Sequence, residues 1–227
     1  MKNLQENETV LPFAVKDCAL IALSTGLRAH NLRELGVHLG TVSAGSIYYH
    51  FWGGLLRPWF DDPEYMNDFA AWARHSLHDK RLAERLAIID PTEYTDLEEL
   101  RHELIDVIES RIDESEVVPW ASADQLFYFM ESQIVVFDTG IRVEEPLALA
   151  EVIPKLAVGS IFYHFIDARR RNASGRNDFS HWLGGLGPEH ATLMEQISNL
   201  DPYFSSLTEL RKQLAATFLR QIEGVPE

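Results

Sequence analysis

The chain has 227 residues, of which 46% are hydrophobic, and a formal net charge of -15 at pH 7. This length is sufficient for one substantial core or two smaller ones. The acidic excess repels phosphate backbones, so we expect no nucleic-acid partner. The single cysteine, Cys18, excludes an intramolecular disulfide framework.

No stretch approaches the roughly 18 consecutive apolar residues that a membrane span requires. The first ten residues, MKNLQENETV, contain no apolar leader. We therefore expect a soluble, cytoplasmic protein without a membrane partner. The sequence leaves its oligomeric state open.

The chain contains two nearly identical heptapeptides, GSIYYHF from Gly45 and GSIFYHF from Gly159, which lie 114 positions apart. At an offset of 110 positions, NDFAAW from Asn67 falls on NDFSHW from Asn177. Self-similarity at a nearly fixed offset indicates a tandem duplication. The predicted copies span 11–114 and 125–224, and 115–124 is the connector.

Each copy begins with apolar residues on alternate positions, such as Phe13 and Val15 or Phe127 and Phe129, which predict a strand. The Thr-Gly pair that follows in each copy predicts a turn. The pattern then changes to that of helices, which begin and end as follows.

In the first copy, Asn31 and Glu34 have the spacing of a capping box, whereas Pro146 fits the first turn of the corresponding helix in the second. A later apolar stripe ends at an Asp-Pro pair in both copies, because proline disfavours a helical conformation at the preceding residue. The last helix of each copy begins at an N-cap residue, Asp96 or Ser206.

Each copy thus predicts one short strand followed by about five helices, a mainly α fold of the α+β class. We expect a pseudo-twofold axis to relate the copies and their two strands to pair, because an identical neighbour can satisfy the backbone groups of an edge strand. The pattern does not decide whether the copies share one core.

Polar residues that occur in both copies are the candidate functional groups. Asn67 and Asn177 each precede an aspartate and an aromatic residue, which is typical of a helix N-cap. We favour capping over a binding role for Asp68 and Asp178. The ligand-binding candidates are Arg28, Arg142, Tyr49, Tyr163, Asn67, Asn177, Trp72 and Trp182.

The two arginines of this set follow the Thr-Gly pairs. Their guanidinium groups would suit an anionic ligand or, alternatively, salt bridges of Arg28 with Asp17 and of Arg142 with Glu131.

His50 and His164 allow two interpretations. In the first, each is a core histidine with satisfied hydrogen bonds that joins its helix to a neighbour such as Asp68. In the second, the two histidines converge at the interface of the copies as metal ligands or catalytic groups, and Asp68 and Asp178 orient them or act with them. No cofactor is indicated.

The motifs S-I-Y-x-H, N-D-F-x-x-W and E-L-R are carried here by Ser46–His50, Asn67–Trp72 and Glu99–Arg101, and nearly the same residues recur in the second copy. In these motifs the chain resembles a bacterial family described only as a domain of unknown function. The resemblance covers both copies and implies the domain, but it implies no activity.

Two functions remain. The favoured one is a non-catalytic binding or regulatory helical-repeat protein for a protein partner or small molecule, because no GxSxG, HExxH or phosphate-loop motif occurs. The alternative is an enzyme, or a metal- or ligand-binding protein, whose His/Asp site lies at the interface of the copies.

Overall fold

The computed structural model describes residues 11–57 and 63–223, so MKNLQENETV lies outside the described residues. The chain divides into two compact units. The first, here called the continuous unit, is the stretch Ala19–Val135. The second, the split unit, combines Met1–Cys18 with Val136–Glu227.

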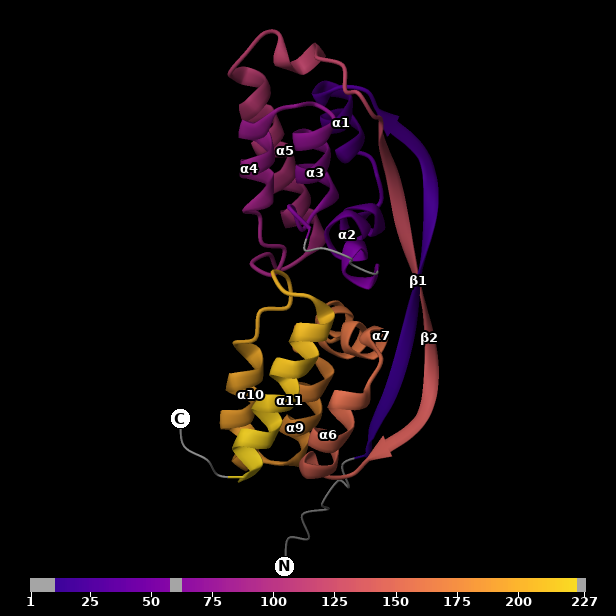
Figure 1. The fold of residues 1–227 in the computed structure, drawn as a ribbon, viewed down its shortest axis with the longest axis vertical. Coiled ribbons are helices and arrows are strands. Elements are labelled where there is room, and N and C mark those ends of the chain that lie inside the picture. The colour runs from indigo at the N-terminus through magenta and orange to yellow at the C-terminus, as the bar shows by residue number, and fades with distance from the viewer. Residues whose placement is uncertain (1–10, 58–62, 224–227) are drawn as a thin grey trace, which may run out of the picture. The chain divides into compact units, whose positions relative to one another are not determined.

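Two strands, β1 (Phe13–Ala29) and β2 (Phe127–Val143), form a two-stranded sheet within the described part of the chain. The Thr25 hydroxyl donates to the Phe129 carbonyl and the Thr139 hydroxyl donates to the Val15 carbonyl. Residue numbers therefore rise along one strand as they fall along the other, and the strands are antiparallel (Figure 1). The predicted pairing of the two strands is confirmed.

The strands are longer than predicted, because the Thr-Gly pairs lie inside them and not at turns. Gly26 and Gly140 have φ angles of 80° and 75°, which residues other than glycine rarely adopt. A glycine in this conformation lets a strand bend without ending, as in a β-bulge. The predicted turns at these two positions are wrong.

The helices of the continuous unit follow β1 in the chain (Figure 1). They are α1 (Leu32–Leu39), α2 (Ala44–Trp52), α3 (Asp68–His75), α4 (Lys80–Ala87) and α5 (Leu97–Asp113). The side chain of Asn31 accepts from the amide of Glu34, and Asp96 accepts from the amides of Glu98 and Glu99. The predicted caps of α1 and α5 are confirmed.

The helices of the split unit follow β2. They are α6 (Pro146–Val152), α7 (Val158–Ile161), a π-helical turn (Phe162–Asp167), α8 (Ala168–Arg171), α9 (Asp178–Leu186), α10 (Ala191–Ser198) and α11 (Leu207–Glu223). Pro146 is the first residue of α6, as predicted. The predicted mainly helical α+β class is confirmed.

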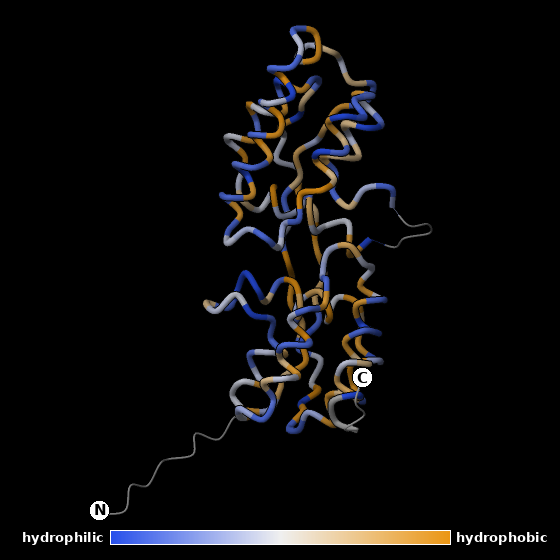
Figure 2. The backbone as a smooth tube through the Cα atoms, turned by 90° about the vertical axis from the view of Figure 1, so that its left-hand side faces the viewer, coloured by the Kyte–Doolittle hydropathy of each residue, from blue (hydrophilic) through white to orange (hydrophobic). Residues whose placement is uncertain are grey.

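Hydrophobic residues recur along the helices of both units (Figure 2), and they form a core in each. In the continuous unit, α1–α5 bury Phe127 and Phe129, which come from the beginning of β2. In the split unit, the helices after β2 bury Phe13 and Val15 from the beginning of β1. The helices that follow β1 thus pack against the start of β2, and the helices that follow β2 pack against the start of β1.

None of the helices in residues 11–57 and 63–223 combines the length and the apolar character of a membrane-crossing helix.

Candidate functional site

The candidate residues divide between the two compact units. His50, Asp68 and their neighbours belong to the continuous unit, whereas His164 and Asp178 belong to the split unit. In each unit the structure places one histidine against one aspartate and against the backbone of a strand.

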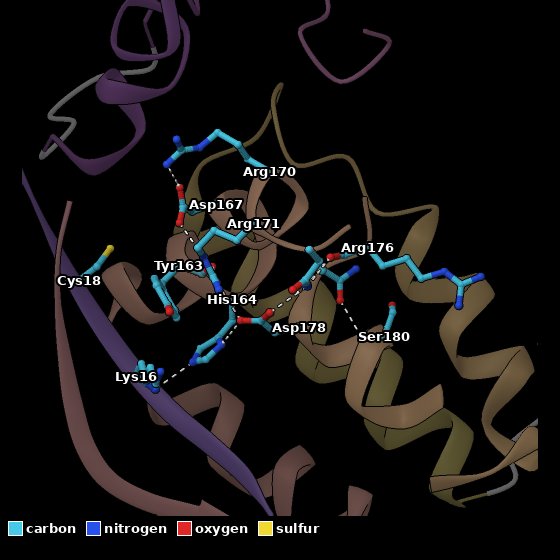
Figure 3. Close-up of polar contacts among 12 residues, drawn as sticks. Lys16, Cys18, Tyr163, His164, Asp167, Arg170, Arg171, Arg176, Asp178 and Ser180 are labelled. Carbon is cyan, nitrogen blue, oxygen red and sulfur yellow. Dashed lines mark hydrogen bonds and ion pairs between the residues drawn. The ribbon is translucent and has the colours of Figure 1, made fainter. Parts of the chain in front are cut away.

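His164 lies in the π-helical turn of the split unit and is 3% exposed. Its Nδ1 lies 2.8 Å from Oδ2 of Asp178, and its Nε2 accepts a hydrogen bond of 2.8 Å from the backbone N–H of Lys16 on β1 (Figure 3). A ring nitrogen that accepts carries no proton, so the proton is on Nδ1 and points to the carboxylate. The imidazole is therefore neutral, and both of its nitrogens are engaged.

His50 makes the corresponding contacts from α2 of the continuous unit, and it is also 3% exposed. Its Nδ1 lies 2.8 Å from Oδ2 of Asp68, and its Nε2 accepts a 3.1 Å hydrogen bond from the backbone N–H of Met130 on β2. The proton of the neutral His50 ring is therefore also on Nδ1. Each histidine joins a strand to the helix that carries its aspartate.

The two tryptophans bind the backbone just before each strand. Trp72 Nε1 donates to the Gln125 carbonyl at 2.7 Å, and Trp182 Nε1 donates to the Leu11 carbonyl at 3.1 Å. Each acceptor lies two residues before the first residue of its strand. In each unit, the tryptophan therefore binds the backbone just before a strand, and the histidine binds the backbone within the same strand.

The glycine that opens each heptapeptide allows the strand to approach its helix. A Cβ atom at Gly159 would collide with the Cys18 carbonyl oxygen and with Oδ1 of Asp17, and one at Gly45 would lie 2.8 Å from Oε1 of Glu131. We refer to Gly45, His50 and Trp72, and to Gly159, His164 and Trp182, as the two strand-docking sites.

Substitution of the two glycines should have unequal effects. Gly159→Ala meets a backbone carbonyl, which cannot move freely, so we expect a loss of about 1–3 kcal/mol in the free energy of unfolding. Gly45→Ala meets only the flexible side chain of Glu131 and should cost less than about 1 kcal/mol. Urea denaturation of both variants measures the difference, and equal losses would contradict this account of the close approach.

The two aspartates have different surroundings. Oδ2 of Asp178 also accepts from Nη2 of Arg171 at 2.9 Å, and Oδ1 accepts from the amide of Asn172 at 3.0 Å. Although burial alone would raise the pKa of Asp178, the hydrogen bonds from His164, Arg171 and Asn172 hold it below its usual value. The side chain of Asp68 is 35% exposed, against 19% for Asp178, and among the described residues it accepts only from His50.

Arg171 is the centre of a polar network in the split unit (Figure 3). Besides Asp178, it binds the carboxylate of Asp167 and the carbonyl of Tyr163, and its guanidinium lies 3.9 Å from the centre of the Tyr163 ring. Sequence reasoning missed this role, because a run of three arginines, here Arg169–Arg171, is typical of an exposed helix end. The acidic residues on either side, Asp167 and Asp178, were the available signal.

The remaining candidates contact groups within their own units. The side chains of Asn67 and Asn177 accept from the amides of Ala70 and Ser180, each at 2.8 Å, which confirms the predicted caps. The hydroxyl of Tyr49 accepts from Arg57.

Arg142 forms two hydrogen bonds of 2.6 and 2.9 Å with Asp138, whose pKa they lower, and this partner replaces the Glu131 expected from the sequence. Arg28 is exposed, and no acidic partner occurs for it among the described residues.

The geometry constrains metal binding and thiol chemistry. No group of three or more His, Cys, Asp or Glu side chains is arranged to hold a metal ion in the described parts of the chain. The Cys18 thiol donates to the Gly159 carbonyl, and burial together with Asp17 and Asp167 raises its pKa to about 12. It therefore stays protonated at neutral pH and is a poor nucleophile.

Comparisons with known proteins identify a family without indicating an activity. Residues 10–219 match the model of a family described as a family of unknown function, DUF5752. A solved structure described as OrfY from Thermoproteus tenax is 28% identical, with a TM-score of 0.80 over 93% of this chain and 96% of that one. No curated protein matches the chain.

Proposed function

The chain belongs to the DUF5752 family, for which no function is established, and we propose that it is a non-catalytic protein-binding or regulatory module. In this proposal the two strand-docking sites serve the fold. The exposed parts of the two strands bind the partner.

We also propose that 11–114 and 125–224 are copies of one duplicated unit. The contacts support this, because each has a counterpart at the offset of the sequence repeat. The docking tryptophans bind Leu11 and Gln125, and the docking histidines bind Lys16 and Met130.

The observation that carries the functional proposal is the engagement of both ring nitrogens in each histidine. A general base or a metal ligand needs a free lone pair on one nitrogen. In His50 and His164 that lone pair already accepts a backbone N–H, and the other nitrogen faces a carboxylate. Catalysis through either ring would first require the strand to leave.

The strands themselves offer a surface for a partner. Ile21 and Leu23 on β1 are each 46% exposed in the continuous unit, and Phe137 on β2 is 50% exposed in the split unit. Ile21 and Leu23 lie two positions apart on one strand, so their side chains share a face, and neighbouring apolar side chains that remain exposed mark interaction sites more often than isolated ones do. The stretch from Cys18 to Leu27 also contains no charged residue.

The backbone of β1 indicates how a partner would bind. The N–H of Lys16 points away from β2, because it donates to His164. N–H groups alternate in direction along a strand, so those of Leu20 and Ala22 also point away from β2. We therefore propose that the partner is a protein that adds an extended, uncharged segment to this edge of β1.

Site-specific crosslinking tests this surface. A photoreactive residue replaces Leu23 in the full chain, and a matched control replaces Val37, which lies on α1 and is 62% exposed. A protein captured only from position 23 is purified, and its affinity for the full chain is measured by calorimetry. We expect Leu23→Lys to weaken binding by about tenfold or more, because a buried lysine would be unpaired in the new interface.

Two results would contradict the proposal. Either Leu23→Lys leaves the affinity unchanged, or Val37→Lys weakens it equally. The enzymatic alternative gains support if His50→Gln and His164→Gln keep the free energy of unfolding of the parent chain and abolish a measurable activity.

A further inference from the structure

The two docking histidines respond to protons in a way that their geometry determines. We propose that His50 and His164 are proton-sensitive latches that release the strands on acidification. The latches act on the same strands that carry the proposed binding surface. Their effect on a partner rests on the proposed function, whereas the release itself does not.

The release follows from the direction of one hydrogen bond in each unit. Nε2 accepts the N–H of Lys16 or of Met130. A proton added to Nε2 converts the acceptor into a donor, so two N–H groups then face each other. Because the ring is buried, water cannot replace the lost acceptor unless the strand moves. The backbone at Lys16 or Met130 must therefore separate from the imidazole.

The carboxylate beside His164 is shared with an arginine. Asp178 on α9 attracts the proton, but the same oxygen, Oδ2, already holds the Arg171 guanidinium at 2.9 Å. A protonated His164 would be a second cation at one carboxylate oxygen. Among the described residues, the other titratable or charged groups on the elements that contact this ring are Asp167 and Tyr163 in its own turn, and Lys16, Asp17 and Cys18 on β1.

The surroundings of His50 differ at the carboxylate. Asp68 on α3 faces Nδ1 at 2.8 Å, and no guanidinium contacts its carboxylate among the described residues. The other groups on the neighbouring elements are Tyr49 with Arg57 on its hydroxyl, Glu131 on β2, and His38 on α1 against Phe129.

Amide hydrogen exchange provides a direct readout, because the released groups are the amides of Met130 and Lys16. The full chain is followed by two-dimensional ¹⁵N NMR between about pH 8 and pH 5, a range that spans the ordinary histidine pKa. At the upper end of this pH range, the ¹⁵N signals of both imidazoles should show that Nε2 carries no proton. On acidification, exchange at Met130 and at Lys16, corrected for the intrinsic rate, should rise about tenfold or more.

A matched substitution isolates the proton. In His50→Gln, the side-chain carbonyl can still accept the Met130 N–H but cannot titrate in this range, so the acid-induced exchange at Met130 should disappear while that at Lys16 remains. His75→Gln, on an exposed ring, should leave both responses unchanged.

Two outcomes would overturn the latch: unchanged protection at Met130 or at Lys16 after the imidazole that accepts its N–H has gained a proton, or an intact acid response at Met130 in His50→Gln. The measurement on the parent chain requires no variant to fold. It also requires no partner, so a failed crosslinking experiment and a failed latch are separate results.

Discussion

Replacing His164 by alanine is expected to lower the free energy of unfolding by about 3 kcal/mol, because the change opens a cavity and leaves the Lys16 amide, which donates to this buried ring, without its acceptor. The Asp178 carboxylate keeps two of its three hydrogen bonds, those from Arg171 and Asn172, and limits the loss. Urea denaturation of the full chain gives the energy, and hydrogen exchange at Lys16 locates it.

The control for this variant is His75→Ala. Its ring is 59% exposed and pairs with Glu64 across 3.1 Å, so the free energy of unfolding should change by less than about 0.5 kcal/mol. A loss in His164→Ala no larger than that of His75→Ala would show that the ring does not hold the strand. His164→Gln should fall between the two, because its carbonyl can accept the Lys16 N–H.

Truncating Phe129 should destabilise the protein by about 3–5 kcal/mol, the usual cost of removing a fully buried aromatic side chain. Its ring is 0% exposed in the continuous unit and lies 4.9 Å, centre to centre, from that of Phe127. Thermal and urea unfolding of Phe129→Ala measure the loss. The unfolding should be detected first in the continuous unit, because α1–α5 bury this ring.

Phe137 on the same strand provides the matched control, since its side chain is 50% exposed. Phe137→Ala should change the free energy of unfolding by less than about 0.5 kcal/mol. Similar losses in the two variants would mean that the beginning of β2 is not part of a helical core.

The local structure was largely predictable from the sequence. Asn31, Asp96 and Asn177 cap helices as their spacing indicates, because an N-cap requires only a side chain and amides within one turn. The strands that begin at Phe13 and Phe127 were likewise predictable, because apolar residues occupy alternate positions of the sequence there. The error at the Thr-Gly pairs arose because a glycine with positive φ fits a bulge as well as a turn.

The long-range arrangement was not predictable in the same way. Alternating apolar residues show that one face of a strand is buried, but they do not show which helices bury it. The donors to His50 and His164 are backbone N–H groups, which every residue except proline carries, so no sequence pattern marks Met130 or Lys16. The aspartate beside His50 was anticipated, whereas the role of Arg171 depends on a turn that only the structure reveals.

The division into a continuous and a split unit has a consequence for synthesis on the ribosome. All of Ala19–Val135 has been made before the second part of the split unit emerges, so the continuous unit can fold first. Phe13 and Val15 then lack the helices that bury them until residues 136–227 have been translated. This takes on the order of 5–20 s at roughly 5–20 residues per second. During that interval the nascent chain exposes an apolar strand end to chaperones and to other chains.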